Sequence, residues 1–285
     1  MERVKLGPSK LWTGLVLHHK DIFVSHVISK LNRTDRCFFA EVNGESLDVL
    51  KYAGVNDLKR WSIDECSSFS TLEWAWNNTK WGKKSQSGKV MDQAWFCWQV
   101  AATNKFEFLK WAREVKQCEW DEQTINVAAF KGNLEMLKYC FSNGCPYDEE
   151  RSCKRAAAGG NLDCLRFLLD KVKPSREMEK DAAIQAVGYV RINILKYLVE
   201  ERKIPEIVKV SCVTNAARYG RLESLNYLVD EAKTPLNDWV HIACARYYEH
   251  PECVNYLLAK GSPEPTDEEY ARYVARKLEE EEQQQ

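Results

Sequence analysis

Two stretches of this chain decide its fold: residues 128–139 read AAFKGNLEMLKY, and residues 156–167 read AAAGGNLDCLRF. Both begin with paired alanines, continue to a glycine, and then repeat leucine at a spacing of three residues. Alanine is the best helix former, and glycine suits the left-handed conformation in which many helices end. Apolar residues three apart mark one face of a second helix. Each stretch therefore predicts a helical hairpin.

The motif recurs along the chain. More degenerate copies occupy residues 186–197 and 216–227, an earlier copy lies at 106–111, and a last copy lies at 252–256. Counted through positions 106, 134, 162, 192, 222 and 251, the steps are 28, 28, 30, 30 and 29 residues. Because one hairpin exposes an apolar face that it cannot bury alone, hairpins repeated at this spacing are expected to stack on one another. The sequence therefore predicts an all-α solenoid.

The paired alanines, Gly132, Gly160, Gly220 and the Leu–Glu or Leu–Asp pairs resemble the ankyrin repeat, in the short-period form of algal and viral proteins. The resemblance covers roughly residues 95–262 and implies stacked helix-turn-helix repeats closed by helical caps. The usual ankyrin period is about 33 residues, and the common T-P-L-H segment is absent here. Only 12 steps lead from Gly144 to the next paired alanines. We therefore expect the fingers of the common repeat to be shortened to turns.

The resemblance also implies a binding surface, because in ankyrin-like repeats the two positions after the paired alanines point into the concave face. Those positions are Phe130 and Lys131, Ala158 and Gly159, Gly188 and Tyr189, Arg218 and Tyr219, and Tyr247 and Tyr248. Aromatic and arginine side chains are enriched at interfaces. The candidate partner-binding residues are therefore Phe130, Lys131, Tyr189, Arg218, Tyr219, Tyr247 and Tyr248. The alternative is that some of these tyrosines pack between neighbouring repeats.

Other aromatic residues are expected to lie in the core. The positions that recur on the second helix of each hairpin are Tyr139, Phe167, Tyr197, Tyr227 and Tyr256. Trp120 and Tyr147 follow helix-ending turns and are expected to be buried as well. Eight of the ten tryptophans fall between Trp61 and Trp120, where their helical spacing favours core over a binding surface. Residues 81–89 between them are predicted to be a basic, flexible loop; contact with phosphate is the alternative to simple solvation.

The ends of the chain do not follow the repeat. Residues 1–60 contain a predicted amphipathic helix over 21–31 and further helix over 34–42 and 47–52, which together indicate an N-terminal helical cap or an F-box-like segment. Residues 61–94 are interpreted as an aromatic-rich degenerate repeat with the basic loop. Residues 263–285 predict a capping helix that begins with a capping box at Thr266, followed by a fraying acidic and glutamine tail from Glu279.

Composition narrows the class of protein. The 285 residues include 41 Lys+Arg, 42 Asp+Glu and 5 His, for a formal net charge of -1, which argues against nucleic-acid binding by bulk charge. No apolar run approaches the roughly 20 residues that span a bilayer, and residues 11–17 lack the pattern of a signal peptide. The 11 cysteines are odd in number and contain no C-x-x-C, which favours reduced, buried thiols. We therefore expect a cytoplasmic or nuclear monomer with no nucleic-acid or membrane partner.

One constellation resembles a metal site: His241, Cys244, His250 and Cys253. Packing already explains Cys253, however, because it occupies the repeat position of Met136 and Cys164, and a structural zinc site needs four converging ligands. No nucleotide-binding or catalytic motif is present. The sequence therefore predicts a non-catalytic protein-binding scaffold with no metal and no cofactor. A substrate adaptor of a ubiquitin ligase, docking ligase components through the F-box-like N-terminus, is the alternative; a metal- or thiol-dependent enzyme is a third hypothesis.

Overall fold

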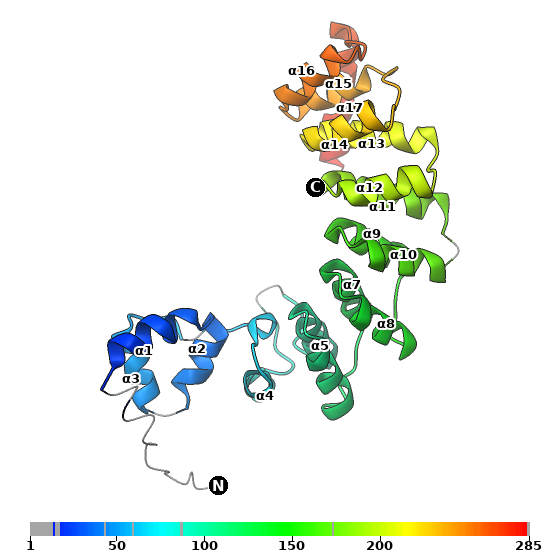
Figure 1. The fold of residues 1–285 in the computed structure, drawn as a ribbon. Helices are drawn as coiled ribbons and strands as arrows, with labels where there is room; N and C mark the ends of the chain where they lie inside the picture. The colour runs from blue at the N-terminus through cyan, green and yellow to red at the C-terminus, as the bar shows by residue number, and fades with distance from the viewer. Residues whose placement is uncertain are drawn as a thin grey trace. The chain divides into compact units, whose positions relative to one another are not determined.

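The computed structural model describes residue 14 and residues 18–42, 44–58, 60–85, 88–172 and 174–283. Within these ranges the chain forms 17 α-helices and short 3-10 and π segments, with no β-strand (Figure 1). The all-α prediction is confirmed. The chain divides into two compact units, Met1–Trp120 and Asp121–Gln285. No helix in the described ranges is both long enough and apolar enough to cross a membrane. Of the segment 11–17, only Gly14 is described.

The second unit is a row of helical hairpins. Its helices are α7 (Glu122–Lys131), α8 (Leu134–Ser142), α9 (Glu149–Gly159), α10 (Leu162–Lys171), α11 (Arg176–Gly188), α12 (Ile192–Lys196), α13 (Glu206–Arg218), α14 (Leu222–Asn226), α15 (Val240–Tyr247), α16 (Pro251–Ala259) and α17 (Asp267–Glu282). The odd-numbered helices from α7 to α15 pack against one another in order (Figure 1). We call these five the first helices of the hairpins. Each packs on the even-numbered helix that follows it along the chain, as α7 does on α8.

The turn inside each hairpin has one conformation throughout the second unit. Gly132, Gly160 and Gly220 have φ values of 77°, 80° and 65°, which confirms the predicted left-handed glycines. In the other two hairpins the same position holds Val190 (φ 55°) and Glu249 (φ 59°). A β-branched residue in this region is a conformational outlier. The turn geometry is therefore imposed by the packing of the two helices and does not depend on glycine being present.

Two kinds of ending recur among the second helices, and they differ in the length of the segment before the left-handed residue. Gly144 is left-handed (φ 71°) and lies ten residues after Leu134; α8 ends just before it as a regular α-helix. Lys203 is also left-handed (φ 52°) but lies eleven residues after Ile192. The helix α12 continues there into a π segment, Tyr197–Glu201, and α14 continues likewise into Tyr227–Glu231. The extra residue is accommodated as a π-bulge.

Burial in the second unit follows the repeat. The paired alanines 128–129, 156–157 and 216–217 are fully buried between hairpins. Tyr197 and Tyr227 are buried as predicted, whereas Tyr139, Phe167 and Tyr256 are half-buried. All 11 cysteines of the chain are buried, and burial raises the pKa of the Cys153 thiol to about 12.

The prediction that Tyr147 is buried is wrong. Its side chain is exposed and its ring packs beside Phe141, with 5.1 Å between ring centroids. Tyr147 lies in the linker between α8 and α9, where one neighbouring ring covers one side of it. Trp120, in the first unit, is half-buried beneath the guanidinium of Arg113.

The first unit contains shorter helices: α1 (Lys20–His26), α2 (Arg33–Ala40), α3 (Gly44–Tyr52), α4 (Phe69–Asn78), α5 (Gln93–Ala102) and α6 (Phe106–Lys110). The single helix predicted over 21–31 is broken into α1 and a 3-10 turn, Ile28–Lys30. The side chains of Ser25 and His26 both bond to the carbonyl oxygen of Ile22. Such bonds compete with the helical ladder.

The tryptophans that the structure describes in the first unit are half-buried, apart from the exposed Trp81, and some of them pack around the fully buried Phe96. Trp76 makes edge contacts with Trp81, Phe96 and Trp111. The basic segment 81–89, predicted to be flexible, has paired backbone in its described part: the N–H of Met91 donates to Lys83 (2.8 Å), and that of Ser85 donates to Lys89 (2.7 Å). Residues 86 and 87 lie outside the described ranges. Hairpin pairing therefore gives this loop a defined backbone.

The C-terminal helix begins as predicted and ends later than predicted. Thr266 and Glu269 form the reciprocal capping box that starts α17. The helix continues to Glu282, so Glu279–Glu282, expected to fray, are helical. Lys277 and Arg276 both form ion pairs with Glu280 one turn away. Pairs at this spacing stabilise a helix end.

Candidate partner-binding surface

The candidate partner-binding residues predicted from the sequence lie at the C-terminal ends of the first helices. We define the first-helix face as the two residues of each hairpin that precede its left-handed turn residue: Phe130, Lys131, Ala158, Gly159, Gly188, Tyr189, Arg218, Tyr219, Tyr247 and Tyr248. Three of its aromatic side chains are exposed although they are large and apolar: Phe130 (37%), Tyr189 (51%) and Tyr219 (43%). Lys131 and Arg218 are exposed as well.

The local fold explains why these side chains point outward. Ala216 and Ala217 are fully buried against neighbouring helices. Successive helical residues turn by about 100°, so the next two positions leave the packed side of the helix. In α9 the same two positions are small. A Cβ atom on Gly159 would lie 2.2 Å from the carbonyl oxygen of Phe130. The ends of α7 and α9 therefore approach so closely that only glycine fits there.

A row of cross-hairpin hydrogen bonds fixes the spacing along this face. Each bond runs from the residue after the left-handed turn to the carbonyl oxygen of the first face residue of the preceding hairpin. The bonds are Asn161 Nδ2 to Phe130 O (2.7 Å), Arg191 Nε to Ala158 O (3.0 Å), Arg221 Nε to Gly188 O (2.8 Å) and His250 Nε2 to Arg218 O (3.0 Å). Carbonyl groups at a helix end lack intrahelical partners, and positive side chains are favoured there. These bonds therefore cap each first helix from the next hairpin.

Sequence reasoning missed this row of bonds. Its signal was present, because a polar or basic residue follows the turn in every copy: Asn133, Asn161, Arg191, Arg221 and His250. The side chain of Asn133 accepts from the N–H of Met136 in its own helix, so a polar residue at this position has more than one available partner. The spacing alone could not indicate which one it uses.

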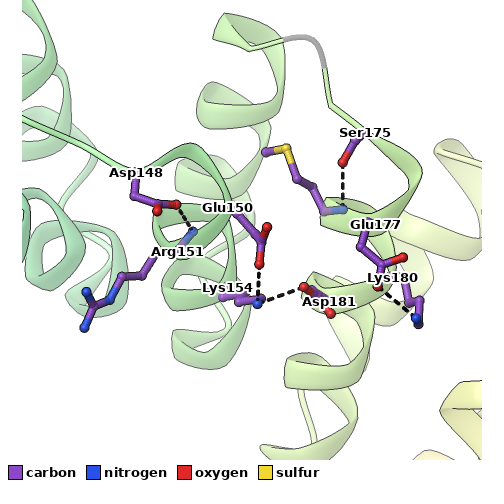
Figure 2. Close-up of polar contacts among 9 residues, drawn as sticks. Asp148, Glu150, Arg151, Lys154, Ser175, Glu177, Lys180 and Asp181 are labelled. Atoms are coloured by element: carbon purple, nitrogen blue, oxygen red, sulfur yellow. Dashed lines mark hydrogen bonds and ion pairs between the residues drawn. The ribbon is translucent and has the colours of Figure 1, made fainter.

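Nearer the N-termini of the first helices, charges are paired between neighbours. Lys154 of α9 contacts Glu150 in the same helix (2.6 Å) and Asp181 of α11 (2.8 Å), as Figure 2 shows. The hydrogen bonds that Lys154 donates to Asp181 and Glu150 raise its pKa. Arg151 of α9 pairs with Glu122 of α7 at 2.5 Å. In this part of the surface the named basic side chains are therefore neutralised by acidic side chains of the same or a neighbouring helix.

Toward the turns, positive charges lack acidic partners. Lys131 and Arg218 form no ion pair within the residues that the structure describes. Arg155 lies one helical turn before Gly159, is exposed, and likewise forms no ion pair within the described ranges. Arg155 was not among the candidates from the sequence. It was missed because only the two positions after the alanines were considered. The first-helix face, together with Arg155 beside it, therefore combines exposed aromatic rings with cations that form no ion pair in the described ranges.

Tyr247 and Tyr248 differ from the other candidates because both are half-buried. Their rings meet edge to face at 5.0 Å, and Tyr247 also contacts Tyr273 of α17 at 6.0 Å. The guanidinium of Arg218 lies 5.0 Å from the ring centroid of Tyr248 and 5.8 Å from that of Tyr219. These residues form one aromatic and cationic cluster, which α17 covers in part.

The metal-like constellation does not converge. His241 is fully buried, with Nδ1 3.0 Å from the hydroxyl of Thr214, whereas His250 bonds to the backbone of Arg218. Burial lowers the pKa of His241. In the described ranges, no group of three or more His, Cys, Asp or Glu side chains is placed to hold a metal ion. Cys253 is buried in the repeat position that Met136 and Cys164 also fill.

No family model matches this chain, and no curated protein matches it.

Proposed function

We propose that this protein is a non-catalytic scaffold that binds another protein, and that residues 95–262 are ankyrin-like repeats forming a solenoid whose concave side carries the first-helix face. The observation that carries the proposal is the exposure of three aromatic side chains on the first-helix face of separate hairpins: Phe130 at the first face position, and Tyr189 and Tyr219 at the second. Large exposed aromatic residues are typical anchors of protein interfaces. Lys131, Arg155 and Arg218 lie among them without ion-pair partners in the described ranges.

The rigid spacing of the face supports the same proposal. The cross-hairpin bonds of Asn161, Arg191 and Arg221 hold the ends of successive first helices. A surface that is already ordered loses little conformational entropy when it binds. A partner can therefore contact several hairpins at once without reorganising them.

Site-specific crosslinking tests this function. A photoreactive phenylalanine analogue is placed in the full chain at Tyr189 or Tyr219, and at Leu258 as the control. Leu258 is 37% exposed, as Phe130 is, but lies on the second helix α16. We expect one discrete protein adduct from both tyrosine positions and none from Leu258. Adducts of equal yield at all three positions, or at none, would contradict a partner site on the first-helix face.

We assign residues 1–60 to an N-terminal helical cap. The helix α3 ends as α8 does: Val55 N–H donates to Leu50 O, Cys145 N–H donates to Cys140 O, and a left-handed glycine precedes each donor. This similarity favours a degenerate repeat over an adaptor segment. Ubiquitin-ligase components retained by the full chain, and lost when the exposed residues Ile22 and Val42 are replaced by aspartate, would favour the adaptor instead.

A further inference from the structure

The C-terminal helix lies on one end of the first-helix face. Tyr273 of α17 is 4% exposed and packs with Ala243 and Cys244 of α15. The ring of Tyr273 lies 6.0 Å from that of Tyr247, and burial together with the charge of Glu281, two turns further along α17, raises the pKa of Tyr247. Residues at these spacings share one side of a helix. That side therefore extends from the apolar contact at Tyr273 to an acidic end beside Tyr247.

The charges of the two surfaces are complementary. Residues 279–282 of α17 are four consecutive glutamates, and the Arg218–Tyr248 pair that they approach carries a cation without an ion-pair partner in the described ranges. Burial raises the pKa of Tyr247, and the Glu281 carboxylate raises it further. A hydrogen bond from Lys277 lowers the pKa of Glu280, and the charge of Arg218 contributes in the same direction. The ring contact between Tyr273 and Tyr247 therefore places the acidic end of α17 where its charge acts on the cationic part of the face without forming an ion pair in the described ranges.

The contact between α17 and the first-helix face buries few side chains. Tyr273 is the one residue of α17 that is buried, and Leu278 on its last turns is 50% exposed. A groove of about 440 Å³ stays open between α17 and the start of α15, lined in part by Trp239, Val240 and Arg272. Few buried apolar contacts mean a low free energy of local opening. The last two turns of α17 can therefore leave the face without unfolding the hairpins.

We propose that the partner of this protein presents an acidic helical segment, which competes with the last two turns of α17 for Arg218, Tyr247 and Tyr248. The inference rests on the proposed function and specifies the chemistry of the partner. In the unbound chain the glutamates of α17 occupy the place of the partner's acidic side chains. Exposed Arg155 and Lys131 extend the same positive character along the face, so a longer acidic segment gains further contacts. Charge complementarity of this kind selects partners and speeds their association.

The chain supplies its own probe: a fluorescent peptide with the sequence of residues 266–285, added to the full-length protein and followed by anisotropy. The test protein carries Glu280→Lys and Glu281→Lys, which turn the internal contact into a repulsive one. We expect this variant to bind the peptide at least about tenfold more tightly than the unaltered chain does. Adding Arg218→Glu should remove the gain, and a peptide with glutamine at 279–282 should bind weakly to every form.

Two controls keep the result interpretable. Arg176→Glu reverses a charge at the start of α11, away from the cluster, and should leave peptide binding within about twofold. Glu280→Gln with Glu281→Gln is a milder pair of substitutions, should produce a smaller gain, and serves if the lysine pair alters the circular dichroism spectrum. Equal binding by the unaltered chain and by both glutamate variants, or binding insensitive to Arg218→Glu, would overturn the proposal. The peptide is a defined ligand, so this result is independent of whether crosslinking finds a cellular partner.

Discussion

At the scale of single residues, the close approach of α7 and α9 is decided by Gly159. It has no left-handed backbone, so its importance is steric: a Cβ atom would lie 2.2 Å from Phe130 O and 2.4 Å from Asn161 Nδ2. Both atoms take part in the hydrogen bond that caps α7. Neither contact can relax without losing that bond, because one atom belongs to the backbone.

Gly159→Ala should therefore destabilise the protein by about 1–3 kcal/mol, the range expected for overpacking. Gly188→Ala is the matched control: its added Cβ would meet Tyr219 at 3.8 Å, an ordinary contact. Because Gly188 is helical, alanine there should stabilise by about 0.5–1 kcal/mol. Urea denaturation of both variants measures the two values. A neutral Gly159→Ala would show that the hairpins can separate at no cost.

At the scale of the element, the hairpin turn requires one left-handed residue, and Val190 is the costliest residue that fills it. Its φ of 55° is unfavourable for any residue with a Cβ atom, by about 1–2 kcal/mol. The surrounding helices α11 and α12 hold it there, through bonds such as Arg191 N–H to Ala186 O at 2.7 Å.

Val190→Gly should therefore raise the free energy of unfolding by about 1 kcal/mol. Gly220→Val, the reverse change in the next hairpin, should lower stability by more than that. It adds left-handed strain, and its Cβ would lie 2.6 Å from the ring of His250. Thermal denaturation of the two variants provides the comparison. A loss of stability in Val190→Gly would show that the half-buried valine side chain contributes more by packing than its backbone costs.

At the scale of the whole molecule, stability should depend on pH through His241. This residue is fully buried between α13 and α15, and its Nε2 has no hydrogen-bond partner in the described ranges. Burial lowers its pKa below the ordinary value, although the charge of Asp238 opposes the shift. The unfolded chain thus takes up a proton near pH 6.5 that the folded chain does not. The contribution of His241 to stability should be constant above about pH 7.5, one unit above the unfolded pKa, and fall as the pH decreases toward the folded pKa.

We expect the melting temperature to fall between about pH 7.5 and about pH 5.5, with His241 accounting for at most about 1.4 kcal/mol of the lost stability. In His241→Gln, which keeps a polar group near Thr214, this part of the fall should disappear. The same fall in the variant and in the unaltered chain would assign the pH dependence to other groups.

The sequence by itself determined the helical hairpins, their left-handed glycines and the cap at Thr266, because these features depend on residues a few positions apart. The second helix of each hairpin could be predicted from the sequence for the same reason. The sequence also placed Phe130, Tyr189 and Tyr219 in the two positions before the hairpin turn, and their exposure follows from the helical angle after the buried residues that precede them.

Only the tertiary structure decided which groups from different hairpins meet. The bond from Asn161 to Phe130 O and the contact of α17 with Tyr247 both depend on distances between elements. Local propensity contains no term for these distances. Tyr247 and Tyr273 illustrate this: they are far apart in the sequence, yet their rings lie 6.0 Å apart in the fold.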